Sequence, residues 1–187
     1  MAVQLVDEMA IRQVNIDRHY LFTYVDKIES AVTTQDPQVF KDTINNWTTF
    51  SGARELTFAA LKHAMQQVSS NAFVCVWTDE IGDDTSNATL KAEILSLKAS
   101  TNSEIFFMAI TYLPTKKIMG RKARDVTEPQ NDDDFPGKKR ASLNISNFEH
   151  KFNEIGHVLD ITNDPNVIDK VINIMKQTAI CQTSTTP

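Results

Sequence analysis

The sequence has few cysteines, few glycines and no long apolar run. Its 187 residues include two cysteines and five glycines, too few for a disulfide scaffold. Neither glycine-rich phosphate loop, G-x-G-x-x-G or G-x-x-x-x-G-K-[ST], occurs, and no G-x-S-x-G elbow presents a nucleophilic serine. No apolar run approaches the roughly 20 residues of a membrane-spanning helix, and the first residues lack the apolar core of a secretory signal. These absences argue against an enzyme and against a membrane-spanning protein.

An excess of basic charge is also missing. The formal net charge is -5, and lysine and arginine are scattered along the chain. Nucleic-acid binding driven by counterion release needs a clustered basic surface, so nucleic acid is not the expected partner. With 41% hydrophobic residues, the chain can bury the core of one domain. We expect that domain to cover residues 1–180, followed by a disordered tail at 181–187.

Apolar periodicity predicts an alternation of helices and strands. Expected strands are 19–26, 27–34 (an edge strand), 72–78, 104–113 and 157–161; expected helices are 3–14, one opening at Asp36 and Pro37, 56–68, one capped by Thr85 or Ser86, one around 148–155 and one opening at Asp164 and Pro165. The strands at 72–78 and 104–113 are almost wholly apolar, which is typical of parallel strands covered on both faces. The pattern predicts an α/β fold: a doubly wound, mainly parallel sheet with helices on both faces and one antiparallel edge strand.

The stretch from residue 114 to residue 140 does not fit this alternation. It contains "KKIMGRKAR" and "NDDDFPGKKR" and is too long for an ordinary connection. Acids interleave with the bases, so a solvated surface insertion is favoured over a nuclear-localisation signal.

Four carboxylates crowd the exit of the strand at 72–78. Asp79, Glu80, Asp83 and Asp84 all precede the next helix. Ligands of parallel sheets bind beyond the carboxyl ends of the strands, which makes this a candidate site. The positive end of a helix dipole also favours acids, so the cluster is either a cation site or a solvated turn.

The order of these elements resembles the von Willebrand factor A domain, specifically its hemicentin-like extracellular branch. The stretch "NAFVCVWTDEIGDDTSNATLKAEILSLKASTNSEIFFMAIT" is similar to the middle of such domains, in which an apolar strand ends in a Thr-Asp pair. "RHYLFTYVD" is similar to their second strand, and "NFEHKFNEIGHVLDITNDPNVIDKVINIM" to their last helix, strand and helix. The resemblance implies a Rossmann-like fold.

The family's metal ion-dependent adhesion site draws ligands from three loops, and this chain keeps only part of it. Asp79 matches the aspartate of the third loop. The Asp-x-Ser-x-Ser motif of the first loop is absent, and Gly52 and Ala53 stand where the second loop carries an acid and a cysteine. Ser51 or Thr49 would be substitute hydroxyl ligands. The resemblance therefore implies a degenerate or incomplete site, with Mg²⁺ or another divalent cation as the cofactor if one binds.

The family's first strand, which lies at the centre of the sheet, has no counterpart either. Without it, the strands at 20–25 and 73–78 are expected to expose apolar edges or to pair directly with each other.

By resemblance, the chain is a non-enzymatic module for protein interaction or adhesion. The expected partner is an extracellular-matrix or cell-surface protein that docks on loops carrying Glu55, Glu80, Asp83 and Asp84. A vestigial or structural paralogue without metal-dependent binding is an alternative, and a small nucleotide-dependent α/β enzyme is a weaker one. The resemblance implies secretion; if Met1 is the true start, a cytosolic protein is expected instead.

Overall fold

The chain folds as an alternation of helices and strands close to the expected one. The computed structural model describes residues 1–24, 28–46, 55–68, 70–111 and 144–178. In chain order the elements are α1 (Ala2–Ile11), β1 (His19–Tyr24), β2 (Ile28–Thr34), α2 (Pro37–Asn45), α3 (Thr57–Gln67), β3 (Phe73–Thr78), α4 (Ala88–Thr101), β4 (Glu104–Ala109), α5 (Ile145–Phe152), β5 (His157–Asp160) and α6 (Val167–Gln177). The predicted insertion at 114–140 and the predicted tail at 181–187 lie outside the described residues. Within the described ranges, no helix combines the length and the apolarity needed to cross a membrane.

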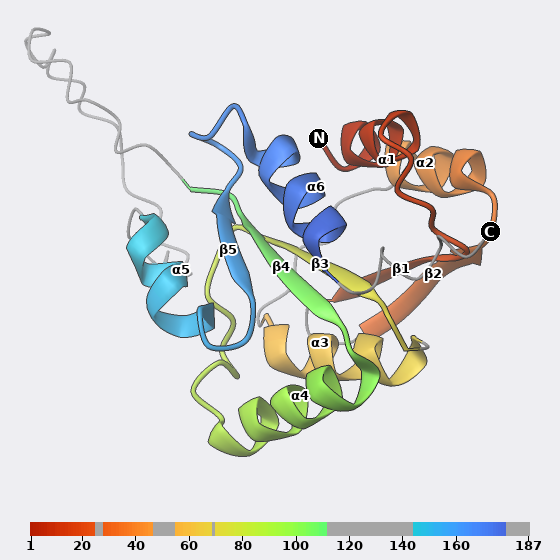
Figure 1. Ribbon diagram of the computed structural model, residues 1–187. Helices are drawn as coiled ribbons and strands as arrows, with labels where there is room; N and C mark the ends of the chain where they lie inside the picture. The colour runs from red at the N-terminus through yellow and green to blue at the C-terminus, as the bar shows by residue number, and fades with distance from the viewer. Residues whose placement is uncertain (25–27, 47–54, 69, 112–143, 179–187) are drawn as a thin grey trace, which may run out of the picture.

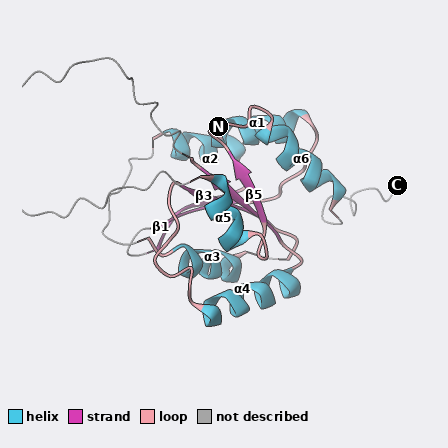
Figure 2. Cartoon of the chain, turned by 90° about the vertical axis from the view of Figure 1, so that its left-hand side faces the viewer, coloured by secondary structure: helices cyan, strands magenta, loops and turns pink. Residues whose placement is uncertain are grey.

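Strand β4 separates two hydrophobic cores. Residues 105–109 have no exposed surface. Ile105, Phe107 and Ala109 pack into a core with α3, α4 and α5, whereas Phe106 and Met108 pack into a second core with α1 and α6. Because successive side chains of a strand point to opposite faces, helices must cover both faces of the sheet. Figures 1 and 2 show these layers, with α1, α2 and α6 on one side of the strands and α3 and α4 on the other. The predicted α/β class is confirmed.

The strands form two sheets among the described residues. In the first, β1 pairs antiparallel with β2, as predicted for the edge strand. In the second, β3, β4 and β5 run parallel in that order. Helix α3 packs against both sheets: Leu61 and Met65 share a core with Val76 of β3, and the ring of His63 meets Phe22 of β1 edge-on at 5.6 Å. Of the two expected arrangements for β1 and β3, direct pairing is therefore not the one adopted.

A tyrosine side chain spans the space between β1 and β3. The carbonyl oxygens of Ala72 and Thr78 accept hydrogen bonds from the β4 side. Because carbonyls alternate in direction along a strand, that of Trp77 points away from β4. The hydroxyl of Tyr24, at the end of β1, donates to this oxygen at 3.4 Å. If β1 and β3 were neighbours in one sheet, they would lie about 4.8 Å apart and pair through main-chain groups. Here the Tyr24 side chain makes the contact between them instead.

Helix starts were predicted with mixed success. Asp36 caps α2 as expected, its carboxylate accepting from the amides of Gln38 and Val39. The expected cap of α4 by Thr85 or Ser86 is wrong, because Asn87 accepts from the first-turn amides instead. Helix α6 also begins later than predicted, with Asn166 as its N-cap; Asp164 and Pro165 form the turn before it. At α4, adjacent residues offered equivalent capping side chains; at α6, the Asn166 side chain makes no capping hydrogen bond, and the Asp164 carboxylate accepts from the Asn166 amide.

Gly156, at the turn between α5 and β5, is a site where the fold leaves no room for a side chain. A Cβ atom there would overlap the carbonyl oxygen of Ile105 and lie 2.9 Å from the Ile105 carbonyl carbon. Since Ile105 belongs to the buried strand β4, the backbone cannot yield cheaply.

We therefore expect Gly156→Ala to lower the free energy of unfolding by about 1–3 kcal/mol, measured by urea denaturation. The control is Asn153→Ala at the nearby exposed end of α5, which should have a smaller effect. An equal effect of the two substitutions would contradict the predicted overlap.

Candidate functional site

The candidate site lies at the carboxyl end of β3, where the connection of residues 79–87 leads to α4. Glu80 and Asp83 are exposed on this connection, and Asp79 and Asp84 are partly buried. Glu55, just before α3, lies beside it. Thr49 and Ser51 lie outside the described residues, so their predicted role as ligands stays a prediction. The structure thus brings Glu55 together with the acid cluster.

Asp84 has a structural task that the sequence did not reveal. Its two carboxylate oxygens accept hydrogen bonds from the amides of Phe58 and Ala59, at 3.0 and 2.7 Å. These amides belong to the first turn of α3, whose own N-cap position, Leu56, offers no capping side chain. The acids were expected to support the next helix, α4. Asp84 instead caps the preceding one, across 25 residues of chain.

The connection is also held against α3 through its backbone. The amide of Asp83 donates to the carbonyl of Glu55 at 2.8 Å. Gly82 approaches so closely that a Cβ atom there would lie 2.8 Å from the same carbonyl oxygen and overlap the hydroxyl of Thr57. Thr85 donates its side-chain hydroxyl to the Gly82 carbonyl at 2.8 Å. These contacts join residues 55–57 and 82–85 into one rigid unit.

A polar cluster lies under the connection. The buried Thr78 Oγ1 lies 2.7 Å from Glu55 Oε1 and 2.6 Å from the carbonyl oxygen of Glu80. The pKa of Glu55 is raised to about 7: burial is the largest cause, the neighbouring Glu80 carboxyl also raises it, and the hydrogen bonds of Thr78 and Tyr24 lower it. Burial likewise raises the pKa of Tyr24. Thr57 Oγ1 is buried without a hydrogen-bond partner in the part of the chain described.

A second polar cluster, at the ends of β4 and β5, was not predicted. Asp160 accepts from the hydroxyl of Thr111 at 2.8 Å, from the amides of Thr162 and Asn163 and from the side chain of Asn163. Burial alone would raise the pKa of Asp160, but the hydrogen bonds of Asn163 and Thr111 outweigh it and lower that pKa below its usual value. An acid directly after an apolar strand was the signal that identified Asp79, and "HVLD" carries the same signal.

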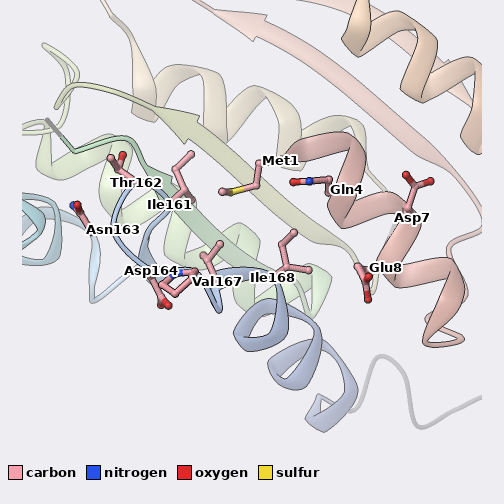
Figure 3. A pocket seen from close by; sticks show the side chains of 11 residues that line it. Met1, Gln4, Asp7, Glu8, Ile161, Thr162, Asn163, Asp164, Val167 and Ile168 are labelled. Carbon is pink, nitrogen blue, oxygen red and sulfur yellow. The ribbon is translucent and has the colours of Figure 1, made fainter.

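Two hollows flank these clusters. One, of about 410 Å³, is lined by Leu56, Asp83, Asp84, Ser86 and Asn87. The other, of about 750 Å³, lies between the start of α1 and the turn from β5 into α6. Figure 3 shows Met1 and Gln4 on the α1 side and Ile161, Thr162 and Asn163 on the other. Both hollows lie at the carboxyl edge of the parallel strands.

The described residues do not form a complete metal site. Within them, no three His, Cys, Asp or Glu side chains come together in a way that could hold a cation. Both oxygens of Asp84 already accept amide hydrogen bonds. A divalent cation such as Mg²⁺ needs several converging oxygens, and among the acids of the connection only Asp79 matches a ligand of the family's site.

The capping role of Asp84 gives a direct test. Asp84→Ala leaves two amides of α3 without their acceptor, so we expect the free energy of unfolding to fall by about 1–2 kcal/mol in urea denaturation. Asp83→Ala, at the exposed neighbouring position, is the matched control and should change stability by less than about 0.5 kcal/mol. Similar losses from both substitutions would refute the cap.

Comparison with known proteins agrees with this architecture. A search of curated proteins finds no match. Among solved structures, an uncharacterized membrane spanning protein from Vibrio fischeri is similar with a TM-score of 0.30 and 13% identity, covering 94% of this chain and 82% of that one; this likeness is too weak to carry any argument. The family model of the von Willebrand factor A domain matches residues 1–137. Domains of this family are generally protein-interaction modules rather than enzymes. The chain belongs to the von Willebrand factor A domain family.

Proposed function

We propose that this chain binds a protein partner through the connection of residues 79–87 and the hollow beside it. The observation that carries the proposal is the rigid attachment of this connection to α3 through Asp84, Gly82 and Asp83. A surface that is already ordered loses little entropy when it binds. Glu80 and Asp83 are exposed there, and Asp83 lines the hollow together with the partly buried Leu56, so the surface combines acidic groups with an apolar contact.

Binding on this surface is metal-independent in our proposal. The family's adhesion site needs ligands from three loops, and this chain supplies one clear match, Asp79. The carboxylate of Asp84 is committed to α3. Contacts with a partner would therefore be made by the protein's own side chains, and a basic group on the partner would complement Glu80 and Asp83.

The hemicentin-like resemblance supports an extracellular setting, with a matrix or cell-surface protein as the partner. The rival proposal is a structural or vestigial paralogue that binds nothing. The attachment of the connection to α3 supports the binding module, because a surface that is already ordered loses little entropy when it binds.

The first test concerns the metal. A site that binds Mg²⁺ well below the added concentration would raise the unfolding temperature by mass action. We expect millimolar Mg²⁺ to leave the unfolding temperature unchanged, in both the wild-type chain and Asp79→Ala, when each is compared with the same protein in EDTA. A rise in the wild-type chain that Asp79→Ala abolishes would show a working metal site and overturn metal independence.

The second test concerns the partner. A photo-crosslinking residue at Asp83 lies on the proposed surface, and one at Ser100, near the end of α4, is the matched exposed control at the opposite edge of the sheet. On intact cells and matrix, we expect the Asp83 probe to give a discrete crosslinked protein that the Ser100 probe does not give, with equal yield in EDTA. The same products from both probes, or none from either, would contradict the proposed surface.

A further inference from the structure

If Glu55 is ionised, the polar cluster beneath the connection has one proton too few for the two short contacts of Thr78. Thr78 Oγ1 lies 2.7 Å from a carboxyl oxygen of Glu55 and 2.6 Å from the carbonyl oxygen of Glu80. A hydroxyl has one proton to donate, and a carbonyl oxygen can only accept. The same Thr78 oxygen also accepts from the amide of Glu80 at 3.3 Å.

Each of the two short contacts has a proton of its own in only one arrangement. Thr78 donates to the Glu80 carbonyl, and the Glu55 carboxyl donates to Thr78. An ionised Glu55 would take the single Thr78 proton for itself, which leaves the partly buried contact between Thr78 and the Glu80 carbonyl as two oxygens facing each other without a proton. Such an unsatisfied contact is costly.

We infer that Glu55 carries a proton in this arrangement and that its ionisation releases the start of the 79–87 connection, so that pH controls the proposed binding surface. The release begins at the Thr78–Glu80 bond and changes how the connection presents Glu80 and Asp83, while Asp84 stays bound to α3. The Glu55 backbone strengthens the coupling, since its carbonyl also accepts from the Asp83 amide. The part of this inference that concerns binding rests on the proposed function; the titration of Glu55 does not.

The surroundings of Glu55 support the protonated form. The titratable groups that contribute most to the pKa of its carboxyl are Glu80 on the connection and Tyr24 on β1. Neither brings a positive charge, and α3 contributes the uncharged Thr57 to the same cluster. Burial is the main cause of the raised pKa of Glu55, about 7, and the like charge of Glu80 adds to it.

The sign of the pH effect follows from this shift. The pKa of Glu55 rises from 4.5 to about 7 on folding, so the proton favours the folded state. Its contribution to stability is complete below about pH 4.5, declines as pH rises, and is gone above about pH 7. A change of pH around neutrality therefore acts on the connection of residues 79–87.

Carboxyl NMR of the full chain tests the proton without any partner. With ¹³C-labelled glutamate, one carboxyl carbon should titrate with a midpoint of about 7 and be missing in Glu55→Gln. The amide of Glu80 should shift with the same midpoint in the wild-type chain and keep its low-pH position throughout in Glu55→Gln, whose neutral amide can still donate to Thr78. Glu149→Gln, at an exposed position of α5, is the control and should change neither signal.

Two further results sharpen the test. Glu80→Gln removes the neighbouring charge but keeps the carbonyl, so the Glu55 midpoint should fall while the Glu80-position amide still follows it. A Glu55 midpoint near 4.5, or an unaltered pH response of the Glu80 amide in Glu55→Gln, would overturn the inference.

The crosslinking probe at Asp83 then connects the proton to binding. Between about pH 6 and about pH 8 the protonated fraction of a group with this pKa falls about tenfold, and the yield of crosslinked partner should fall with it in the wild-type chain. In Glu55→Gln the yield should stay constant. A wild-type yield that does not change with pH overturns control of binding. A carboxyl that titrates as expected, with no crosslinked partner at any pH, rejects the proposed function and upholds the proton-controlled connection.

Discussion

The complete burial of β4 is the constraint on which the rest of the structure depends. A strand whose residues 105–109 expose no surface must have helices on both faces and a strand on each side. Parallel neighbours β3 and β5 meet this need, and parallel strands end at the same edge of the sheet. The connections that follow β3 and β5 are therefore brought to one edge, together with the start of α3. The site is a consequence of covering β4.

That shared edge explains why acids at strand ends do different work. Strand ends beneath packed helices leave amides and hydroxyls that need partners. Asp84 supplies acceptors to the first turn of α3, and Asp160 gathers donors from the ends of β4 and β5. Glu80 and Asp83 remain exposed on the same edge. The acid cluster was expected to be either a cation site or a solvated turn. It also has a third role, because Asp84 forms hydrogen bonds inside the fold with α3.

Local features were predictable from the sequence, and long-range ones were not. Apolar periodicity predicted β3 and β4, and the pair Asp36–Pro37 predicted the start of α2. The choice of Asn87 over Thr85 and Ser86 depended on the exact path of the connection, which composition does not encode. The bond between Asp84 and α3 joins residues 25 or 26 positions apart. Periodicity carries no information about such a contact, so the sequence identified the acid cluster but not what each acid does.

Glu55 lies beside Tyr24, the side chain through which β1 contacts β3. Tyr24, at the end of β1, donates to the outward carbonyl of Trp77 and also interacts with the Glu55 carboxyl. The residue that spans the two sheets therefore belongs to the same cluster as the group that titrates. A strand that paired with the outward edge of β3 would compete with Tyr24 for the Trp77 carbonyl, and would thereby displace a side chain that interacts with the Glu55 carboxyl. The packing of β1 against β3 thus affects the protonation of Glu55 through Tyr24. The connection of residues 79–87 and the arrangement of the two sheets both act on this carboxyl.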